Sequence, residues 1–453
     1  MKAQAVVCGA GIAGIAAAHA LVRDGAASDV ILVDAGPPLS LTSDKSTECY
    51  RNWWPGPGEA MVALSSRSIG LMEALADATG NAIRMDRRGY LYLSADPASA
   101  DSFAATARES CALGAGALRV HERGDTGYRP RRSDGFAGQP DGADLILAPD
   151  LIREQFPCLT AHARVALHVR RAGALSAQQL GMVLLEQARA GGARLLTGSL
   201  EAVSLSGTQV SGVSVRTADG VLSIATPVLV NAAGPYLADV ARLAGVDVPV
   251  VCERHAKITF DDRAGVVPRD TPLAIWCDPT RLAWTADEHA ALASDADGAA
   301  LLAPFPPGVH GRPVGAGHSM LLYWTYHCPV ETPSFPVGWD PHYPEIVLRG
   351  MSVMIPGLAA YHAHMPNAFV DGGYYTKTRE NRPLIGPTPV PGLFLCGAFS
   401  GFGIMTAMGA GELLAAHVLG APLPHYAPAF LLSRYDDPAY CATLDGLAAS
   451  GQI

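Results

Sequence analysis

The opening of the chain holds the pattern that most constrains its fold. Residues 5–8 form a short apolar run typical of a buried strand, and Gly9-Ala10-Gly11-Ile12-Ala13-Gly14 follows directly. An alanine-rich stretch to about Arg23 predicts a helix, and a second apolar run, residues 30–33, ends at Asp34. Strand, glycines, helix, strand and acid in this order predict a βαβ unit that binds a dinucleotide.

Each glycine of this motif has its own expected role. Gly9 makes the tight turn, Gly11 lets the backbone approach a pyrophosphate, and Gly14 lets the helix lie close to the strand. The helix N-terminus offers N–H groups and the positive end of its dipole to the phosphates. Asp34 lies twenty residues after Gly14, where a carboxylate accepts hydrogen bonds from an adenosine ribose.

Composition indicates a globular protein and excludes several classes of partner. Of the 453 residues, 49% are hydrophobic and 17% charged, which gives enough core for two or three domains. A net charge of -9 without any run of Lys or Arg argues against binding to nucleic acid or to an anionic membrane surface. The nine cysteines occur singly, with no CxxC pair. We therefore expect no disulfide framework, no metal site and a reducing, cytoplasmic location.

The sequence also predicts neither a signal peptide nor a membrane span. The first strand begins within five residues of Met1, which leaves no room for a signal peptide. The most apolar stretch, residues 392–423, contains Glu412 and His417 and is interrupted by glycines. This pattern favours a glycine-rich buried turn followed by a helix.

Patterning along the rest of the chain predicts further elements. A polar loop at residues 42–56 leaves the nucleotide crevice and contains two tryptophans. We interpret it as a cofactor or substrate loop; the alternative is a solvated loop whose tryptophans cover the core. Helices are expected at 61–79, 102–113 and 176–191, and strands at 88–93, 201–205, 210–217, 222–230, 248–262 and 320–327.

Four segments together resemble the D-amino-acid oxidase, glycine oxidase and sarcosine oxidase superfamily of FAD-dependent enzymes. They are the opening motif with Asp34; Gly89-Tyr90-Leu91; residues 231–236 (NAAGPY); and residues 378–386 (TRENRPLIG), followed by 397–403 (GAFSGFG) and 409–411 (GAG). These resemble the family's opening motif, its strand entering the substrate domain, its "NAAGxW" turn and its "TxDxxPxxG … GFSGHG" region. The resemblance extends from residue 5 to about 420, nearly the whole chain.

The sequence departs from the family pattern at four positions. Glu380 stands where Asp is usual, Ala398 replaces the first glycine of the C-terminal loop, and Phe402 replaces its histidine. Sarcosine oxidases have a lysine just after this loop that helps to hold the substrate carboxylate, and here Met405 stands there. These departures put a small, carboxylate-clamped N-methyl amino acid in doubt and favour a bulkier or less charged amine.

The resemblance implies an α/β fold and a discontinuous layout. A Rossmann-like FAD domain of the glutathione-reductase type would comprise residues 1–88, 163–247 and 368–453. It would be interleaved with a mixed-sheet α+β substrate domain, residues 89–162 and 248–367. A helix starting near Met408 would direct its positive N-terminal end at the flavin ring. The residues implied in FAD binding are Gly9, Gly11, Ile12, Ala13, Gly14, Asp34, Ala35, Lys45, Ser46, Val203, Ala233, Gly234, Gly397, Gly401, Phe402, Gly403, Ile404 and Met405.

The implied reaction moves a hydride from a C–H group next to nitrogen onto flavin N5. Arg51 is the candidate for holding a substrate carboxylate or shaping the flavin pocket, because a guanidinium binds carboxylates through two bonds; the alternative is a surface ion pair. His255 and Lys257 share one face of a strand by alternation. They would tune amine protonation and assist the reaction with oxygen; the alternatives are a structural histidine and a solvent-facing lysine.

The remaining catalytic candidates lie on two other segments. Tyr323, Thr325 and His327 would form one face of a strand that either lines the substrate cavity or only packs, and Tyr375 precedes the segment that closes the pocket in the family. Cys49, His255 and Cys396 are candidates for covalent flavin attachment by proximity alone.

The sequence thus predicts an FAD-dependent oxidase or dehydrogenase of amines or amino acids, with O2 or another electron acceptor. Two alternatives remain open. One is a flavin-holding β-type subunit of a heteromeric sarcosine-oxidase-like or amino-acid-dehydrogenase complex, which would need a partner subunit. The other is an FAD- and NAD(P)H-dependent hydroxylase, although residues 396–398 lack the Asp that such enzymes use to bind ribitol.

Overall fold

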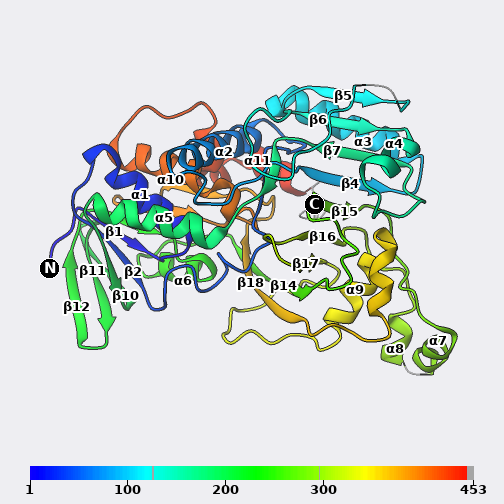
Figure 1. Ribbon diagram of the computed structural model, residues 1–453. Coiled ribbons are helices and arrows are strands. Elements are labelled where there is room, and N and C mark those ends of the chain that lie inside the picture. Colours follow the sequence, from blue (N-terminus) through cyan, green and yellow to red (C-terminus); the bar gives the residue numbers. More distant parts are fainter. Residues whose placement is uncertain (125–126, 295, 446–453) are drawn as a thin grey trace.

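Two large sheets lie side by side in the computed structural model of the chain, which describes residues 1–124, 127–294 and 296–445 (Figure 1). The first has six strands in the order β19-β20-β13-β1-β2-β9, and all its pairs are parallel except β19 with β20. Its strands are β1 (Ala5–Cys8), β2 (Val30–Asp34), β9 (Ala193–Thr197), β13 (Leu229–Asn231), β19 (Leu384–Pro387) and β20 (Leu393–Gly397).

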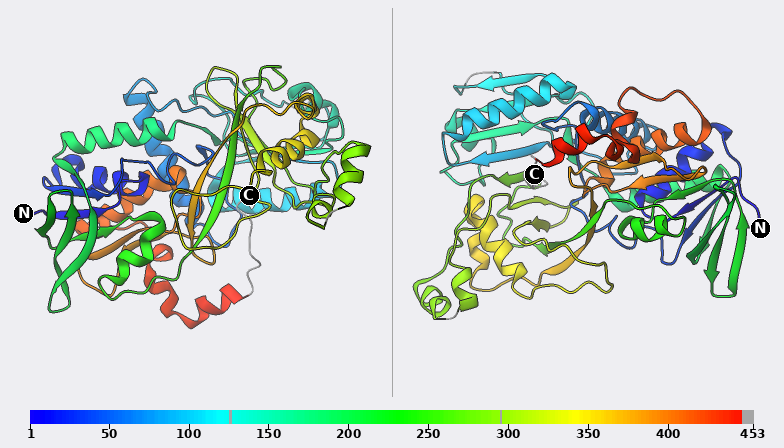
Figure 2. Two further views of the ribbon diagram at one scale, coloured as in Figure 1. Left: turned by 90° about the horizontal axis from the view of Figure 1, so that it is seen from below. Right: turned by 180° about the vertical axis from the view of Figure 1, so that it is seen from behind.

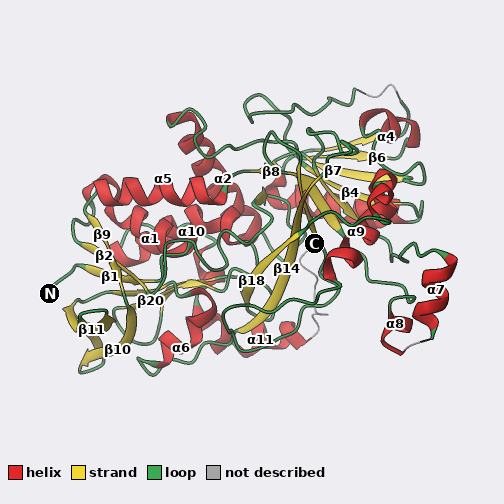
Figure 3. Ribbon diagram, turned by 60° about the horizontal axis from the view of Figure 1, so that its bottom comes forward, coloured by secondary structure: helices red, strands yellow, loops and turns green. Residues whose placement is uncertain are grey.

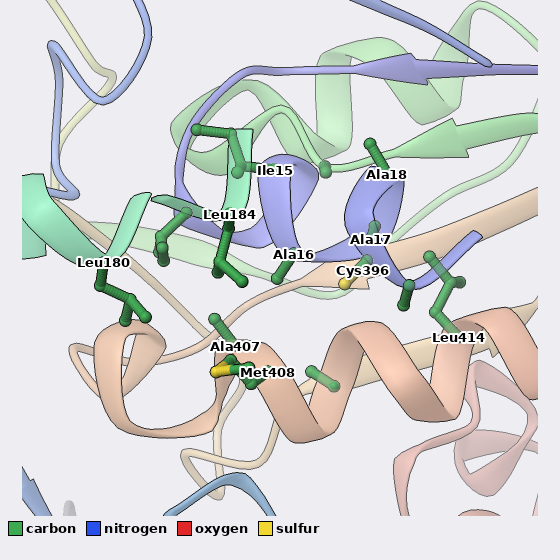
Figure 4. Close-up of a cluster of buried hydrophobic side chains, with 14 of the residues drawn as sticks. Ile15, Ala16, Ala17, Ala18, Leu180, Leu184, Cys396, Ala407, Met408 and Leu414 are labelled. Atoms are coloured by element: carbon green, nitrogen blue, oxygen red, sulfur yellow. The ribbon is translucent and has the colours of Figure 1, made fainter. Parts of the chain in front are cut away.

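Helices cover one face of this sheet. They are α1 (Ile12–Val22), α5 (Ala177–Ala190) and α10 (Gly403–Leu419), and α2 (Ala60–Ala78) packs on α10. Small residues of α1 let it lie between α5 and α10, where Ile15 of α1, Leu184 of α5 and Met408 of α10 meet in one buried cluster (Figure 4). The other face packs against α6 (Leu237–Arg242) and a three-stranded antiparallel sheet, β10 (Ser199–Ser206), β11 (Gln209–Thr217) and β12 (Gly220–Ala225).

The second sheet is mixed and has nine strands in the order β18-β14-β17-β16-β15-β4-β7-β6-β5. They are β4 (Tyr90–Ser94), β5 (Leu118–His121), β6 (Ala143–Ile146), β7 (Val165–Val169), β14 (Val251–Asp261), β15 (Leu273–Trp276), β16 (His310–Pro313), β17 (Ser319–Tyr323) and β18 (Phe369–Lys377). The long strands β14 and β18 run next to the six-stranded half (Figure 3).

The faces of this second sheet are covered by helices too. α4 (Pro149–Gln155) and α9 (Tyr343–Met354) pack on one face, and α3 (Ser99–Ser110) packs on the other. A short pair, β3 (Cys49–Arg51) with β8 (Ala172–Ala174), lies between the two halves of the molecule. The last described helix, α11 (Pro438–Asp445), lies at the edge of the molecule in the left view of Figure 2 and over the boundary between its two halves in the right view. Two further helices, α7 (Ala286–Ala293) and α8 (Ala296–Ala300), project from the nine-stranded half.

The α/β fold class and the βαβ opening are confirmed, with α1 and β2 close to their predicted bounds. Three predicted elements differ. The strand expected at 222–230 is divided into β12 and β13, the strand expected at 320–327 ends at Tyr323, and the helix expected near Met408 begins at Gly403. None of the helices in the described part of the chain combines the length and the apolar character that crossing a membrane needs.

Sheet membership differs from the expected domain boundaries at two strands. β7 and β18 fall within the ranges 163–247 and 368–453 that we assigned to the FAD domain, yet both pair within the nine-stranded sheet. Each strand lies at the start of its predicted range. The hydrophobic pattern there does not show in which half of the molecule a strand pairs.

Candidate functional site

The glycine-rich turn is shaped by close backbone contacts. Gly9 has φ +107°, and a Cβ atom at this position would lie 2.3 Å from the Ala232 carbonyl oxygen. A Cβ atom at Gly14 would lie 1.8 Å from the Gly9 carbonyl oxygen. At Gly11 the nearest atom to such a Cβ is the side-chain oxygen of Ser43, at 3.1 Å. Gly9 and Gly14 therefore let helix and strands approach, whereas the space in front of Gly11 is bounded only by a small side chain.

Polar groups organise the start of α1 around this turn. One carboxylate oxygen of Asp34 accepts a hydrogen bond from Ala10 N at 2.7 Å, and the other accepts from Gly36 N at 2.8 Å. Ser43 Oγ accepts from Ile12 N at 2.9 Å. The sequence analysis missed Ser43; the available signal was a hydroxyl residue in the loop that follows β2.

A nucleotide-side cavity of about 100 Å³ lies in front of the α1 N-terminus, between the opening motif and the C-terminal loop. Of the residues predicted to bind the cofactor, those that line it are Gly11, Ile12, Ala13, Ser46, Gly234, Gly397, Gly401, Gly403 and Ile404. The start of α10 lies at this cavity, so its N–H groups and positive dipole end face the space.

The other predicted cofactor residues lie elsewhere. Gly9, Gly14 and Asp34 shape the turn itself, Ala233 lies beside Gly9, and Ala35 is exposed after β2. Lys45 forms ion pairs with Asp44 (3.3 Å) and with Asp371 of β18 (3.2 Å), while Val203 pairs with Val213 in the separate three-stranded sheet.

An inner cavity of about 60 Å³ adjoins the nucleotide-side cavity and shares Ser46, Tyr375, Gly401 and Ile404 with it. Its wall on the side of the nine-stranded sheet comes from β4, β15, β16, β17 and β18, and its other wall comes from the start of α10. The polar and aromatic residues around it include Cys49, Arg51, His310, Tyr323 and Tyr375, with Phe402 and Met405 opposite. The structure thus brings together three of the residues predicted for catalysis on separate segments, Arg51, Tyr323 and Tyr375.

An outer chamber of about 1010 Å³ follows on the other side of Arg51. It shares Arg51, Ile275 and Phe402 with the inner cavity. Loop 53–58, α3 and α11 form much of its wall, and strands of the nine-stranded sheet contribute to the rest. The three spaces therefore form a series from the glycine-rich turn to the outer chamber.

Arg51 is buried at the junction of the inner cavity and the outer chamber, so the surface-ion-pair alternative is wrong. Its guanidinium lies 5.8 Å from the ring centre of Trp54, 5.5 Å from that of Tyr90 and 5.9 Å from that of Phe402. One of its N–H groups donates to the Tyr92 hydroxyl. Aromatic faces stabilise a cation in such a place, because their quadrupole attracts it where little water is present.

His255 lies behind the inner cavity and contacts its lining residues. Its Nδ1 atom is 2.5 Å from the Tyr323 hydroxyl, and its ring stacks on that of Tyr375 at 4.1 Å between centroids. Its Nε2 atom is 3.1 Å from Glu253, which also accepts from Lys377 at 2.9 Å. Burial lowers the pKa of His255 even though Glu253 opposes this shift.

Lys257 shares the face of β14 with His255, as alternation predicts, and its side chain is buried rather than solvent-facing. Its ammonium donates to the backbone oxygens of Asp44 (3.2 Å) and Ser46 (2.9 Å). Burial lowers its pKa, and the carboxylate of Asp371 opposes the shift. Lys257 therefore anchors the loop that carries Ser43 to strand β14 of the nine-stranded sheet.

The prediction for His327 is wrong as a matter of strand geometry. β17 ends at Tyr323, and His327 lies exposed in the loop that follows, so it shares no sheet face with Tyr323. In its place the inner cavity contains His310, which the sequence analysis missed because β16 has only four residues and no clear period. Its Nδ1 atom lies 2.8 Å from the Gly308 carbonyl oxygen, and burial lowers its pKa to about 4.

The thiols near the cavities are held protonated. Cys49 lines the inner cavity and Cys396 the nucleotide-side cavity. Burial raises the pKa of both thiols, that of Cys396 to about 12. His255 does not line either cavity, because Tyr323 and Tyr375 stand in front of it.

Comparison with known proteins identifies the class to which this fold and site belong. The family model described as "FAD dependent oxidoreductase" matches residues 4–417. This chain belongs to that family of FAD-dependent oxidoreductases. No match was found among the curated proteins.

Solved structures show the same fold at low sequence identity. The chain is similar to L-proline dehydrogenase from P. horikoshii (TM-score 0.71, 19% identity, 96% of this chain and 98% of that chain covered). It is also similar to glycine oxidase from Geobacillus kaustophilus (0.70, 16%, 96% and 99%). A third similar structure is iminodiacetate oxidase from Chelativorans sp. BNC1 (0.68, 19%, 94% and 98%).

The residues around the nucleotide-side cavity fit the cofactor of this family. Two helix N-termini, those of α1 and α10, face the space, and helix N-termini attract phosphate and other negative charge. Gly11 lines this cavity without a side chain, so that its backbone can approach a pyrophosphate. FAD is therefore the cofactor expected here.

Proposed function

We propose that this protein oxidises a C–N bond of an amine or amino-acid-like substrate at the inner cavity. The observation that carries the proposal is the meeting of Arg51, His310, Tyr323 and Tyr375 around one small space next to the α10 N-terminus. Bound FAD supplies the acceptor for a hydride from the carbon next to nitrogen. The cavity residues then have to hold the substrate, keep its amine neutral and exclude water.

Arg51 is placed to hold an anionic group of the substrate. It is buried among aromatic rings at the entrance of the inner cavity, where a guanidinium binds a carboxylate more strongly than it would in water. A carboxylate held here directs the neighbouring carbon into the inner cavity, which has room for little more than that carbon and its amine.

Tyr323, His255 and Glu253 offer a route for the proton that the amine must lose. Tyr323 lines the inner cavity, and its hydroxyl is in hydrogen-bond contact with His255 Nδ1, whose other nitrogen contacts Glu253. Burial lowers the pKa of His255 and so favours its neutral ring, whose Nδ1 atom is placed to accept the proton of the Tyr323 hydroxyl. His255 thus acts through Tyr323, as a positioning residue behind the cavity.

The experiment that tests the proposal is the visible spectrum of the purified holoprotein under nitrogen, before and after addition of amino acids and N-alkyl amines. Bleaching of the flavin bands by a member of the pool is the expected result. Recovery on admitting air would identify O2 as acceptor, and slow recovery would indicate another acceptor. Bleaching by NAD(P)H but by no amine would refute the proposal in favour of the hydroxylase, and co-purification with a partner needed for bleaching would favour the subunit alternative.

The variant Tyr323→Phe distinguishes an effect on flavin reduction from an effect on flavin binding. We expect unchanged flavin content and a slower rate of flavin reduction, with a pH profile that differs from that of the wild type. A rate and pH profile equal to the wild type would show that the Tyr323–His255 contact takes no part in the reaction.

A further inference from the structure

We propose that the outer chamber binds a large apolar, ring-bearing group of the substrate, so that the natural substrate is an amino-acid-like amine with an aromatic or branched substituent. This inference rests on the proposed function and specifies its substrate class. It follows from the size, the walls and the charge distribution of the chamber.

The chamber is far larger than a small amino acid needs. Its volume is about 1010 Å³, against about 60 Å³ for the inner cavity. Cavities for complete drug-sized ligands have roughly 300–1,000 Å³. A methyl or ethyl substituent at the inner cavity would leave this space to water, whereas a ring placed there would be removed from water.

The walls of the chamber are mainly apolar and aromatic. Trp54 and Phe402 lie edge to face at its inner end, with ring centres 4.5 Å apart. Phe103 of α3 and Leu444 of α11 contribute from two other sides. Aromatic walls favour a flat ring as ligand, since ring pairs gain energy from edge-to-face and offset contacts in addition to the burial of apolar surface.

The charges around the chamber fix the orientation of the ligand. In the described ranges, the charged residues that line it are Arg51, Glu380 and Arg382. Glu380 is neutralised by Arg434, 2.7 Å away. Arg382 donates to the Pro57 carbonyl oxygen at 3.0 Å. Arg51 is the charged group shared with the inner cavity, so an anionic head belongs there and the apolar group points outward.

The C-terminal segment completes the chamber as a wall. Tyr440, Thr443 and Leu444 of α11 line it, and the Tyr440 hydroxyl donates to Glu380 at 2.8 Å. In the right view of Figure 2, α11 lies over the boundary between the two halves of the molecule, which agrees with this role. The chamber is thus bounded by residues from near position 54 and from near position 444, which lie far apart in the sequence.

The test compares a small and a ring-bearing carboxylate, acetate and indole-3-acetate, as ligands of the holoprotein. Their dissociation constants are measured from the change in the visible spectrum of the flavin. Burial of the ring predicts that indole-3-acetate binds about 10- to 100-fold more tightly than acetate. Equal affinities would overturn the inference.

Two variants that fill the chamber sharpen the test. Thr106→Trp, on the chamber side of α3, and Thr443→Trp, on α11, are each expected to remove the preference for indole-3-acetate and to leave acetate binding unchanged. Ala105→Trp is the matched control, because Ala105 is exposed on the same helix as Thr106. If both chamber variants fold, retain flavin and keep the preference, the ring does not bind in the chamber.

Reduction of the flavin under nitrogen separates this inference from the proposed function. Faster bleaching by phenylalanine or N-benzylglycine than by alanine or N-methylglycine supports both. Bleaching by the small amines alone would leave the proposed function intact and overturn the chamber assignment. A spectral response to indole-3-acetate without bleaching by any amine would refute the proposed reaction and retain the chamber.

Discussion

Replacing Glu380 by alanine is expected to release the C-terminal segment 432–445 from the rest of the protein. The side chains of Glu380 and Arg434 are each only 5% exposed, and their closest atoms are 2.7 Å apart. The hydroxyls of Tyr435 and Tyr440 also donate to this carboxylate, at 2.9 and 2.8 Å. Glu380 is thus the acceptor that three residues of the segment share.

The size of the effect follows from leaving a buried charge without its partner. Burial by itself would raise the pKa of Glu380, but Arg434, a backbone N–H and the Tyr440 hydroxyl together outweigh it and the net shift is downward. Removing one member of a buried ion pair costs about 3–5 kcal/mol. The equilibrium constant for local opening of the segment should therefore rise by roughly 100-fold to several thousand-fold.

The neighbouring residue provides a matched control. Arg379 forms an ion pair with Asp445 at 2.9 Å, also in the C-terminal segment, but these side chains are 54% and 77% exposed. Exposed pairs contribute less than about 1 kcal/mol because water and salt screen them. Arg379→Ala should therefore change the opening constant by less than about fivefold.

Chymotrypsin cleavage after Tyr435 and Tyr440 measures this opening, because cleavage follows the population of the open form when closing is fast. Flavin content and circular dichroism would show that the rest of the variant remains folded. Equal cleavage rates for Glu380→Ala and Arg379→Ala, or a wild-type rate for Glu380→Ala, would refute the reasoning. The pH dependence has a defined sign: since the folded pKa of Glu380 is lowered, its contribution is present above the unfolded value near 4.5 and is lost as the pH falls through the folded pKa.

Three further predictions concern the turn, the inner cavity and the loop that joins the halves. Gly14→Ala should destabilise the protein by about 1–3 kcal/mol or more and abolish flavin retention, since its Cβ would lie 1.8 Å from a backbone oxygen. Urea unfolding and flavin content measure these effects. Gly317→Ala is the control, because a Cβ at Gly317 would meet no atom within 4 Å. The pKa of His310 is about 4 in the folded protein and 6.5 in the unfolded chain. Between these values only the unfolded chain binds the proton, so the free energy of unfolding should decrease by about 3 kcal/mol as the pH falls from 6.5 to 4. The unfolding free energy of His310→Asn should lack this part of the acid dependence. Lys257→Met should weaken FAD binding about tenfold by freeing the loop around Ser46, measured by flavin titration of the apoprotein; unchanged affinity would show that this anchor does not affect the cofactor.

Much of the fold was predictable because its signals are local. The glycines of residues 9–14, the alternation along β14 and the amphipathic pattern of α5 each reflect contacts within one element or with one face of a sheet. The residues that line the inner cavity beside α10 were found in part through the family resemblance. These residues line the inner cavity together with Arg51, which agrees with the expectation that polar groups from separate segments converge at one site.

The predictions from sequence fail at positions where contacts with distant segments determine the local structure. A run such as 320–327 is apolar enough to continue as a strand, but the chain leaves the sheet after Tyr323, and Trp324 is buried with its backbone N–H donating to the Tyr343 hydroxyl at 3.3 Å. His310 enters the site because β16 pairs with β15 and β17. Such pairing depends on distant segments, which leave no periodic signal in a four-residue strand.

The order in which the cofactor site is assembled has a consequence for biosynthesis. α1 packs against α10, and the nucleotide-side cavity is lined by residues from both the opening turn and the loop that precedes α10. From Gly14 to Gly403 the chain advances 389 residues, which takes a ribosome about 20–80 s at 5–20 residues per second. The nascent chain therefore carries an open apolar surface on α1 during nearly all of its synthesis. Chaperone occupancy of that surface, and flavin capture only after release of α10 from the ribosome, are the expected course of its maturation.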